Sequence, residues 1–297
     1  MPSFLKNPIL QAAASALALG VFTWGLSVRV PVRAELGKAL DPEESRKLQE
    51  TAAGLMRSEK WSDALDATLR LHAAYPESHI YIGQLAQIYD HLGKYKEEAA
   101  LWEEYLIRAP RPIEGCPQIG DAYQKQGLSE QATAAFEKCL AIEPYNPDSI
   151  FYLGRAWERA GDLTKAAALY QRGIAVSPQY PDLQIGLARI RLRQGQPEEA
   201  RGLAEKVLSR SQDNTDALLV MGLACQRLGD RKQAKKYLEH GSKLADDYTD
   251  FHLALAGIAE QDSDLNQAIA QYKRVTELDK TNLVAVQRLT TLQGGRQ

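Results

Sequence analysis

The stretch YLGRAWERAGDLTKAAALYQRGIAVSP, residues 152–178, decides the fold. Two segments with the apolar spacing of a helix are separated by Gly161, and the second is followed by Pro178. Glycine readily adopts the left-handed conformation that often ends a helix, and proline cannot continue a helix. The stretch therefore predicts two helices joined by a tight turn.

The pattern recurs with a period of 34 residues. Steps of 34 from Ala166 reach Ala64, Glu98, Ala132, Ala200, Ala234 and Ala268. A small residue lies twelve positions before each member of this column. The residue five positions before each member is glycine in five of the seven repeats. Proline lies twelve positions after it in four of the seven steps. Small residues let two helices approach closely, so the columns indicate a solenoid of stacked helix pairs.

This helix–turn–helix pattern resembles the tetratricopeptide repeat (TPR) family. The matching residues of the fourth repeat are Leu153, Gly154, Trp157, Gly161, Ala166, Tyr170 and Pro178. The resemblance implies an all-α fold: a right-handed α-solenoid of seven helix pairs over residues 45–282, followed by a capping helix and tail at 283–297. The expected repeats are residues 45–78, 79–112, 113–146, 147–180, 181–214, 215–248 and 249–282. Glu98 departs from the alanine column, and the last three repeats lack the proline.

The N-terminal region contains a long apolar segment. Residues 7–28 carry no charge over 22 positions, which is about the length of a helix that spans a bilayer. We expect a tail at 1–8, a transmembrane anchor helix at 9–28 and a linker at 29–44. The alternative is a cleaved signal peptide, because Val32–Ala34 resembles a cleavage site. Basic residues flank the segment on both sides and leave its orientation open.

The sequence contains no recognisable catalytic constellation. Its five histidines show no HExxH spacing, there is no glycine-rich phosphate loop, and the three cysteines form no CxxC pair. The net charge of −2 gives no reason to expect nucleic acid as a partner. Accordingly, we expect no enzymatic activity, no cofactor and no metal. Cys116 and Cys139 are predicted to be buried thiols that pack as neighbours within one helix pair.

A candidate binding surface comes from the resemblance, which implies a concave groove lined by the first helix of each pair. In repeats four to six the corresponding positions carry an apolar strip and a set of arginines. The residues are Phe151, Arg155, Arg159, Ile185, Arg189, Leu192, Arg193, Leu219, Leu223 and Arg227. An exposed apolar strip beside guanidinium groups would suit a partner segment with apolar and acidic side chains. In the alternative interpretation the strip packs on the adjacent repeat and the arginines are solvated.

These features predict a membrane-anchored scaffold that binds protein partners. Its resemblance to bacterial TPR proteins with an N-terminal anchor implies a single-pass protein of the bacterial inner membrane, with a role in assembly or maintenance of a membrane or envelope complex. The alternative is a permanent structural subunit of a larger membrane complex. Small residues such as Gly20 and Gly25 would then let the anchor pack among other transmembrane helices.

Overall fold

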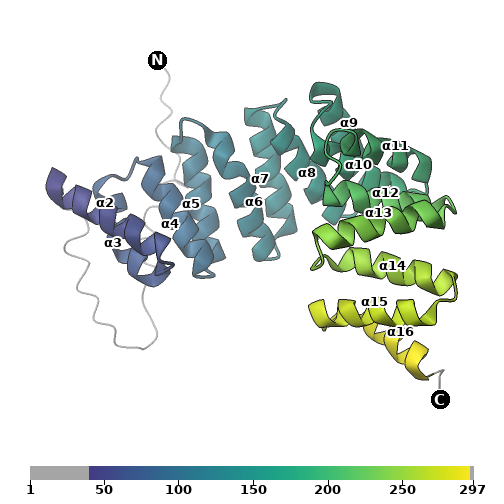
Figure 1. Cartoon of the computed structure of the whole chain (residues 1–297). Helices are drawn as coiled ribbons and strands as arrows, with labels where there is room; N and C mark the ends of the chain where they lie inside the picture. The colour runs from purple at the N-terminus through teal and green to yellow at the C-terminus, as the bar shows by residue number, and fades with distance from the viewer. Residues whose placement is uncertain (1–39, 295–297) are drawn as a thin grey trace.

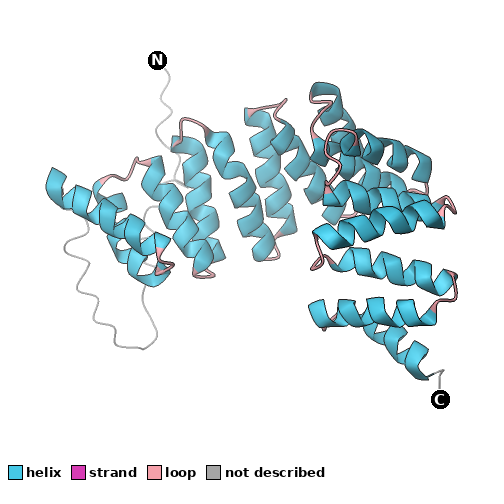
Figure 2. Cartoon of the chain, in the orientation of Figure 1, coloured by secondary structure: helices cyan, strands magenta, loops and turns pink. Residues whose placement is uncertain are grey.

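The computed structural model describes residues 40–294. Within this range the chain forms fifteen α-helices and one short 3₁₀-helix, and it contains no β-strand. Figure 1 shows the helices following one another along a single curved stack, and Figure 2 shows that short loops join them. The described part of the chain is therefore an all-α solenoid, as the period of 34 predicts.

Fourteen of the described α-helices form seven consecutive antiparallel pairs. The pairs are α2 (Pro42–Arg57) with α3 (Trp61–Ala74), α4 (His79–His91) with α5 (Tyr95–Arg108), α6 (Cys116–Lys125) with α7 (Ser129–Ile142), α8 (Pro147–Arg159) with α9 (Leu163–Val176), α10 (Pro181–Arg193) with α11 (Pro197–Leu208), α12 (Thr215–Arg227) with α13 (Arg231–Leu244), and α14 (Thr249–Gln261) with α15 (Leu265–Leu278). The last helix, α16 (Leu283–Gly294), packs on α15. The 3₁₀-helix η1 (Pro112–Gly115) precedes α6.

The turn inside each pair requires a left-handed residue after the first helix. Five pairs place glycine there, with φ between 69° at Gly93 and 83° at Gly229. In the first and last pairs Glu59 and Ser263 adopt the same conformation, with φ of 58° and 59°. The turn geometry is thus common to all seven pairs, and glycine is the residue that adopts it at the lowest cost.

The columns of small residues mark the contacts between the two helices of a pair. A Cβ atom added to Gly154 would lie 2.4 Å from the ring of Tyr170, and one added to Gly120 would lie 1.8 Å from the ring of Phe136. The alanine column is buried as well, and Glu98 occupies the same place with only 3% of its surface exposed. Each column therefore lets an aromatic or aliphatic side chain fill the space between close helices.

The predicted anchor at 9–28 lies outside the described residues. Across residues 40–294, none of the helices combines the length and the apolar character that crossing a bilayer would need.

The prediction of two free thiols at Cys116 and Cys139 is wrong, because the two residues form a disulfide. Cys116 begins α6 and Cys139 lies in the last turn of α7, so the antiparallel pair brings them together with their Cα atoms 5.9 Å apart. This separation lies within the range that a disulfide needs. Cys225 is the one free cysteine of the chain, and it is buried.

Candidate functional site

Three of the arginines assigned to the groove have partners on neighbouring helix pairs. Arg193 Nη1 lies 3.3 Å from Glu158 Oε1, and Arg189 Nε lies 3.9 Å from the same oxygen. The Glu158 side chain is only 9% exposed and also accepts a hydrogen bond from Tyr170 Oη. Arg227 donates to the carbonyl oxygen of Leu192 at the end of α10. These arginines connect α8 with α10 and α10 with α12.

Arg155 and Arg159 differ from them. The two side chains lie one turn apart on α8, and neither forms an ion pair with a carboxylate of residues 40–294. The Arg155 guanidinium lies over the ring of Phe151, 5.6 Å from its centroid. Burial, followed by the positive charge of Arg155, lowers the pKa of Arg159. The pair is therefore a concentration of positive charge without an ion pair among residues 40–294, although the carboxylates of Asp121 and Glu158 partly oppose the lowering of the Arg159 pKa.

Both arginines line a recess between α6 and α8 with a volume of about 170 Å³. The other lining residues are Pro117, Asp121, Gln124, Phe136 and Tyr152. Asp121 is the acidic residue of this set, and its carboxylate lies 2.6 Å from the ammonium group of Lys125. The recess thus combines two guanidinium groups with the polar side chains of Asp121 and Gln124 and a smaller apolar lining from Pro117, Phe136 and Tyr152.

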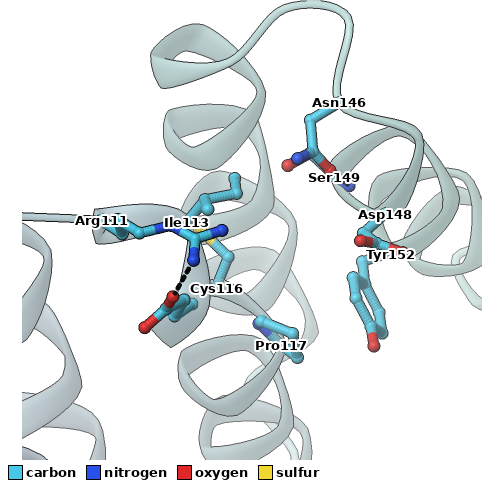
Figure 3. Close-up of a pocket in the computed structure, with 9 residues that line it drawn as sticks. Arg111, Ile113, Cys116, Pro117, Asn146, Asp148, Ser149 and Tyr152 are labelled. Carbon is cyan, nitrogen blue, oxygen red and sulfur yellow. Dashed lines mark hydrogen bonds and ion pairs between the residues drawn. The ribbon is translucent and has the colours of Figure 1, made fainter.

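A second recess, of about 290 Å³, adjoins the first and shares Pro117 and Tyr152 with it. Its remaining lining residues are Arg111, Ile113, Glu114, Cys116, Asn146, Asp148 and Ser149. Figure 3 shows α8, with Asp148 and Tyr152, facing Cys116 and Pro117 across the recess. Tyr180 Oη donates to Asp148, and Arg111 pairs with Glu114 at 3.0 Å. We call the two recesses together the α6–α8 groove.

The apolar strip predicted from the sequence is not an exposed surface. Ile185, Leu192 and Leu219 are 3%, 5% and 8% exposed and belong to one core cluster with the residues of α12. Phe151 and Leu223 are half-buried. Helices α10 and α12 pack against each other across the stack, so apolar residues at this column are covered by the next pair. The burial of Ile185, Leu192 and Leu219 agrees with the alternative interpretation, in which the strip packs on the adjacent repeat.

The groove residues on α6 and η1 were not among those selected from the sequence. Pro117 and Asp121 occupy the same repeat positions as Phe151 and Arg155, one period earlier, so the register could have identified them. Ile113 and Tyr152 have no such signal. They line the groove because η1 replaces the first turn of α6 and because Tyr152 stacks on Phe136, with ring centroids 5.7 Å apart.

Comparisons with known proteins agree with the fold. Two tetratricopeptide repeat family models match the chain, one at residues 114–146 and the other at 159–204 and 191–258. No curated protein sequence gives a significant match. A tetratricopeptide repeat protein from Parabacteroides merdae ATCC 43184 superposes with a TM-score of 0.69 at 13% identity, covering 84% of this chain and 98% of that one.

Two further solved structures are similar. The Cut9–Hcn1 hetero-tetramer of the APC/C gives a TM-score of 0.65 at 16% identity, covering 84% of this chain and 46% of that one. A thermophilic TPR protein from Thermus thermophilus gives 0.53 at 22% identity, covering 61% and 98% of the two chains. At these identities the likeness is one of fold.

Proposed function

We propose that this TPR-like solenoid is a protein-interaction scaffold that binds a segment of a partner protein in the α6–α8 groove. The observation that carries the proposal is the pair Arg155 and Arg159, two guanidinium groups one turn apart with no carboxylate partner among the described residues. Guanidinium groups bind carboxylates through paired hydrogen bonds, and Arg155 is half-buried while Arg159 is exposed to an incoming segment. The partner therefore supplies acidic side chains.

The other end of the α6–α8 groove sets a second requirement for the bound partner segment. Ile113, Pro117 and Tyr152 present apolar surface there, and the charged side chains at its rim, Asp148 and Arg111, already have partners. From Asp148 to Arg159 the groove follows α8 over eleven residues, about 16 Å, which an extended segment of about five residues covers. The segment carries an apolar or aromatic side chain at one end and an acidic one at the other.

The wider role follows from the uncharged stretch at 7–28. A helix of this length would hold the solenoid beside a bilayer. In that position a scaffold serves the assembly or maintenance of a membrane or envelope complex, in the bacterial inner membrane. Recruitment through the groove is favoured over a permanent structural role because a groove with two unpaired cations is suited to a segment that is captured and released.

The test replaces both groove arginines by Arg155→Glu and Arg159→Glu in the full chain. Crosslinking in native membranes, followed by mass spectrometry, identifies the segment bound by the unmodified protein. We expect the double variant to lose that crosslink while its helical circular dichroism and melting temperature stay the same.

Arg201→Glu with Arg210→Glu is the matched control. Both arginines are exposed, lie outside the groove and form no ion pair within residues 40–294. This variant should keep the crosslink. Retention of the crosslink by the groove variant would refute the proposal.

A further inference from the structure

Helix α13 carries a row of lysines on the face that points away from the core. Lys232, Lys235, Lys236 and Lys243 lie on one side of the helix, since residues three, four and eleven positions apart share a face. The opposite side contains the buried residues Ala234, Leu238 and Gly241. Gly241 is in close contact with Phe251 of α14, and Leu238 with Gly222 of α12. We call the four lysines the α13 lysine face.

The positive charge of this face is not neutralised by the described part of the chain. None of the four lysines forms an ion pair with a carboxylate of residues 40–294, whereas Arg231 on the same helix pairs with Asp262 at 3.0 Å. His240 contacts Asp213 at 2.8 Å. Glu239 is the single acidic residue of α13. The lysine side chains, with Tyr237, Glu239 and His240, line an open hollow of about 480 Å³.

The repeat architecture does not require these lysines. Residues at the same position as Lys236 in the other pairs are Asp66, Ala100, Ala134, Ala168, Gly202 and Ala270. Residues at the same position as Lys243 are Ala73, Ile107, Ala141, Ala175, Ser209 and Glu277. No other pair has a basic residue at either position, although all seven pairs build the same fold. At the positions of Lys232 and Lys235 other pairs do carry single basic residues, Lys96 and Arg201, so it is the combination of four lysines that distinguishes this pair, on a chain whose net charge is −2.

We propose that the α13 lysine face is a second interaction surface, distinct from the α6–α8 groove, and that it lies against an anionic lipid surface. All residues around the hollow come from α13, so no second element forms an opposite wall that could hold a peptide. The charges are ammonium groups on flexible stems, which suit a diffuse layer of phosphates better than one fixed carboxylate. Tyr237, half-buried among them, has an amphipathic ring of the type enriched at membrane interfaces.

The length of this surface and the N-terminal sequence agree with a lipid surface. Lys232 and Lys243 are eleven residues apart, about 16 Å along the helix, so all four lysines can reach one plane. The choice of a lipid surface rests on the membrane attachment proposed above, because the uncharged stretch at 7–28 would bring the solenoid close to headgroups. The α6–α8 groove is built from other helices than α13.

The expected strength of membrane binding follows from the positive charge of the α13 lysine face. A lysine beside an anionic membrane increases partitioning by about fivefold, so four lysines, partly offset by Glu239 on the same side of α13, contribute about two orders of magnitude. The interaction should weaken steeply as salt is raised, because exposed charges are screened.

The test uses the full chain with a fluorophore on Gln233→Cys, an exposed position at the start of α13. The chain is reconstituted into vesicles of phosphatidylcholine alone, or of phosphatidylcholine with phosphatidylglycerol, each containing a nitroxide-headgroup lipid as quencher. We expect quenching in the anionic vesicles and not in the neutral ones. Lys236→Gln with Lys243→Gln should reduce it, and Gln at all four positions should abolish it.

Lys206→Gln with Lys273→Gln is the matched control, since both are exposed lysines on α11 and α15 without an ion pair in the described range. Quenching should be unchanged in this variant. The lipid assignment would be overturned by equal quenching in both kinds of vesicle or by no quenching in either. It would also be overturned if the lysine face bound an acidic peptide but no anionic vesicle. Retention of the chain by neutral vesicles reports separately on the anchor, so the two proposals can fail independently.

Discussion

At the residue scale, Glu98 is a buried acid in a column that otherwise holds alanine. Its Oε1 accepts a hydrogen bond from Trp102 Nε1 at 3.3 Å, and its Oε2 has no partner among the described residues. Burial, together with the negative charge of Asp90, raises the pKa of Glu98 from 4.5 to about 7, and the nearby ammonium group of Lys125 only partly opposes this shift. The folded state therefore holds this proton more tightly than the unfolded state does.

The shift predicts a loss of stability as the pH rises. Because the pKa of the folded state lies above that of the unfolded state, the contribution of Glu98 is complete below pH 4.5 and is lost as the pH rises to about 7. The full contribution of the Glu98 shift to the free energy of unfolding is about 3 kcal/mol. Glu98→Gln keeps the shape and the acceptor for Trp102 but cannot ionise. Urea unfolding at pH 5 and pH 8 should show that the variant loses about 2.5 kcal/mol less than the natural chain between the two values, because part of the effect already lies below pH 5. Equal losses would contradict the burial argument.

At the element scale, the pair α6 and α7 differs from the other six. Pro117 is tolerated only in the first turn of a helix, so α6 begins at Cys116, and η1 forms the preceding turn. Cys116 thereby lies beside Cys139, and the disulfide joins the start of α6 to the last turn of α7. Because Cys116 also lines the groove, the bond holds one wall of the candidate site in place.

The disulfide closes a loop of 23 residues, for which chain entropy gives a stabilisation of about 3 kcal/mol. Cys116→Ser with Cys139→Ser should therefore lower the free energy of unfolding by about this amount. A reductant should destabilise the natural chain and leave the double variant unchanged. Alkylation of the denatured, unreduced chain, followed by mass spectrometry, should modify Cys225 alone. Modification of all three cysteines would show that the bond is absent.

At the scale of the whole molecule, the period of 34 predicts the solenoid because each column has a local cause, such as the left-handed turn at Gly161 or the close contact at Gly154. The side-chain contacts of the arginines are harder to predict because the contacting residues lie on different helix pairs. Glu158 sits next to Arg159 in sequence, yet it pairs with Arg189 and Arg193 on α10. The burial of Ile185, Leu192 and Leu219 likewise depends on the packing between pairs, which no single repeat encodes.

The disulfide also bears on which side of a membrane the solenoid lies. The basic residues flanking 7–28 leave the orientation open, but disulfides persist in oxidising compartments and are rare in the cytosol. If the segment at 9–28 spans the inner membrane, the solenoid therefore lies on the outward side. Protease added to cells with a permeabilised outer membrane should degrade residues 40–294, and a cytosolic protein should be spared as the control. Alkylation in intact cells should find Cys116 and Cys139 oxidised. A protected solenoid with both thiols reduced would place it on the cytosolic side and would show that the disulfide does not form in the cell.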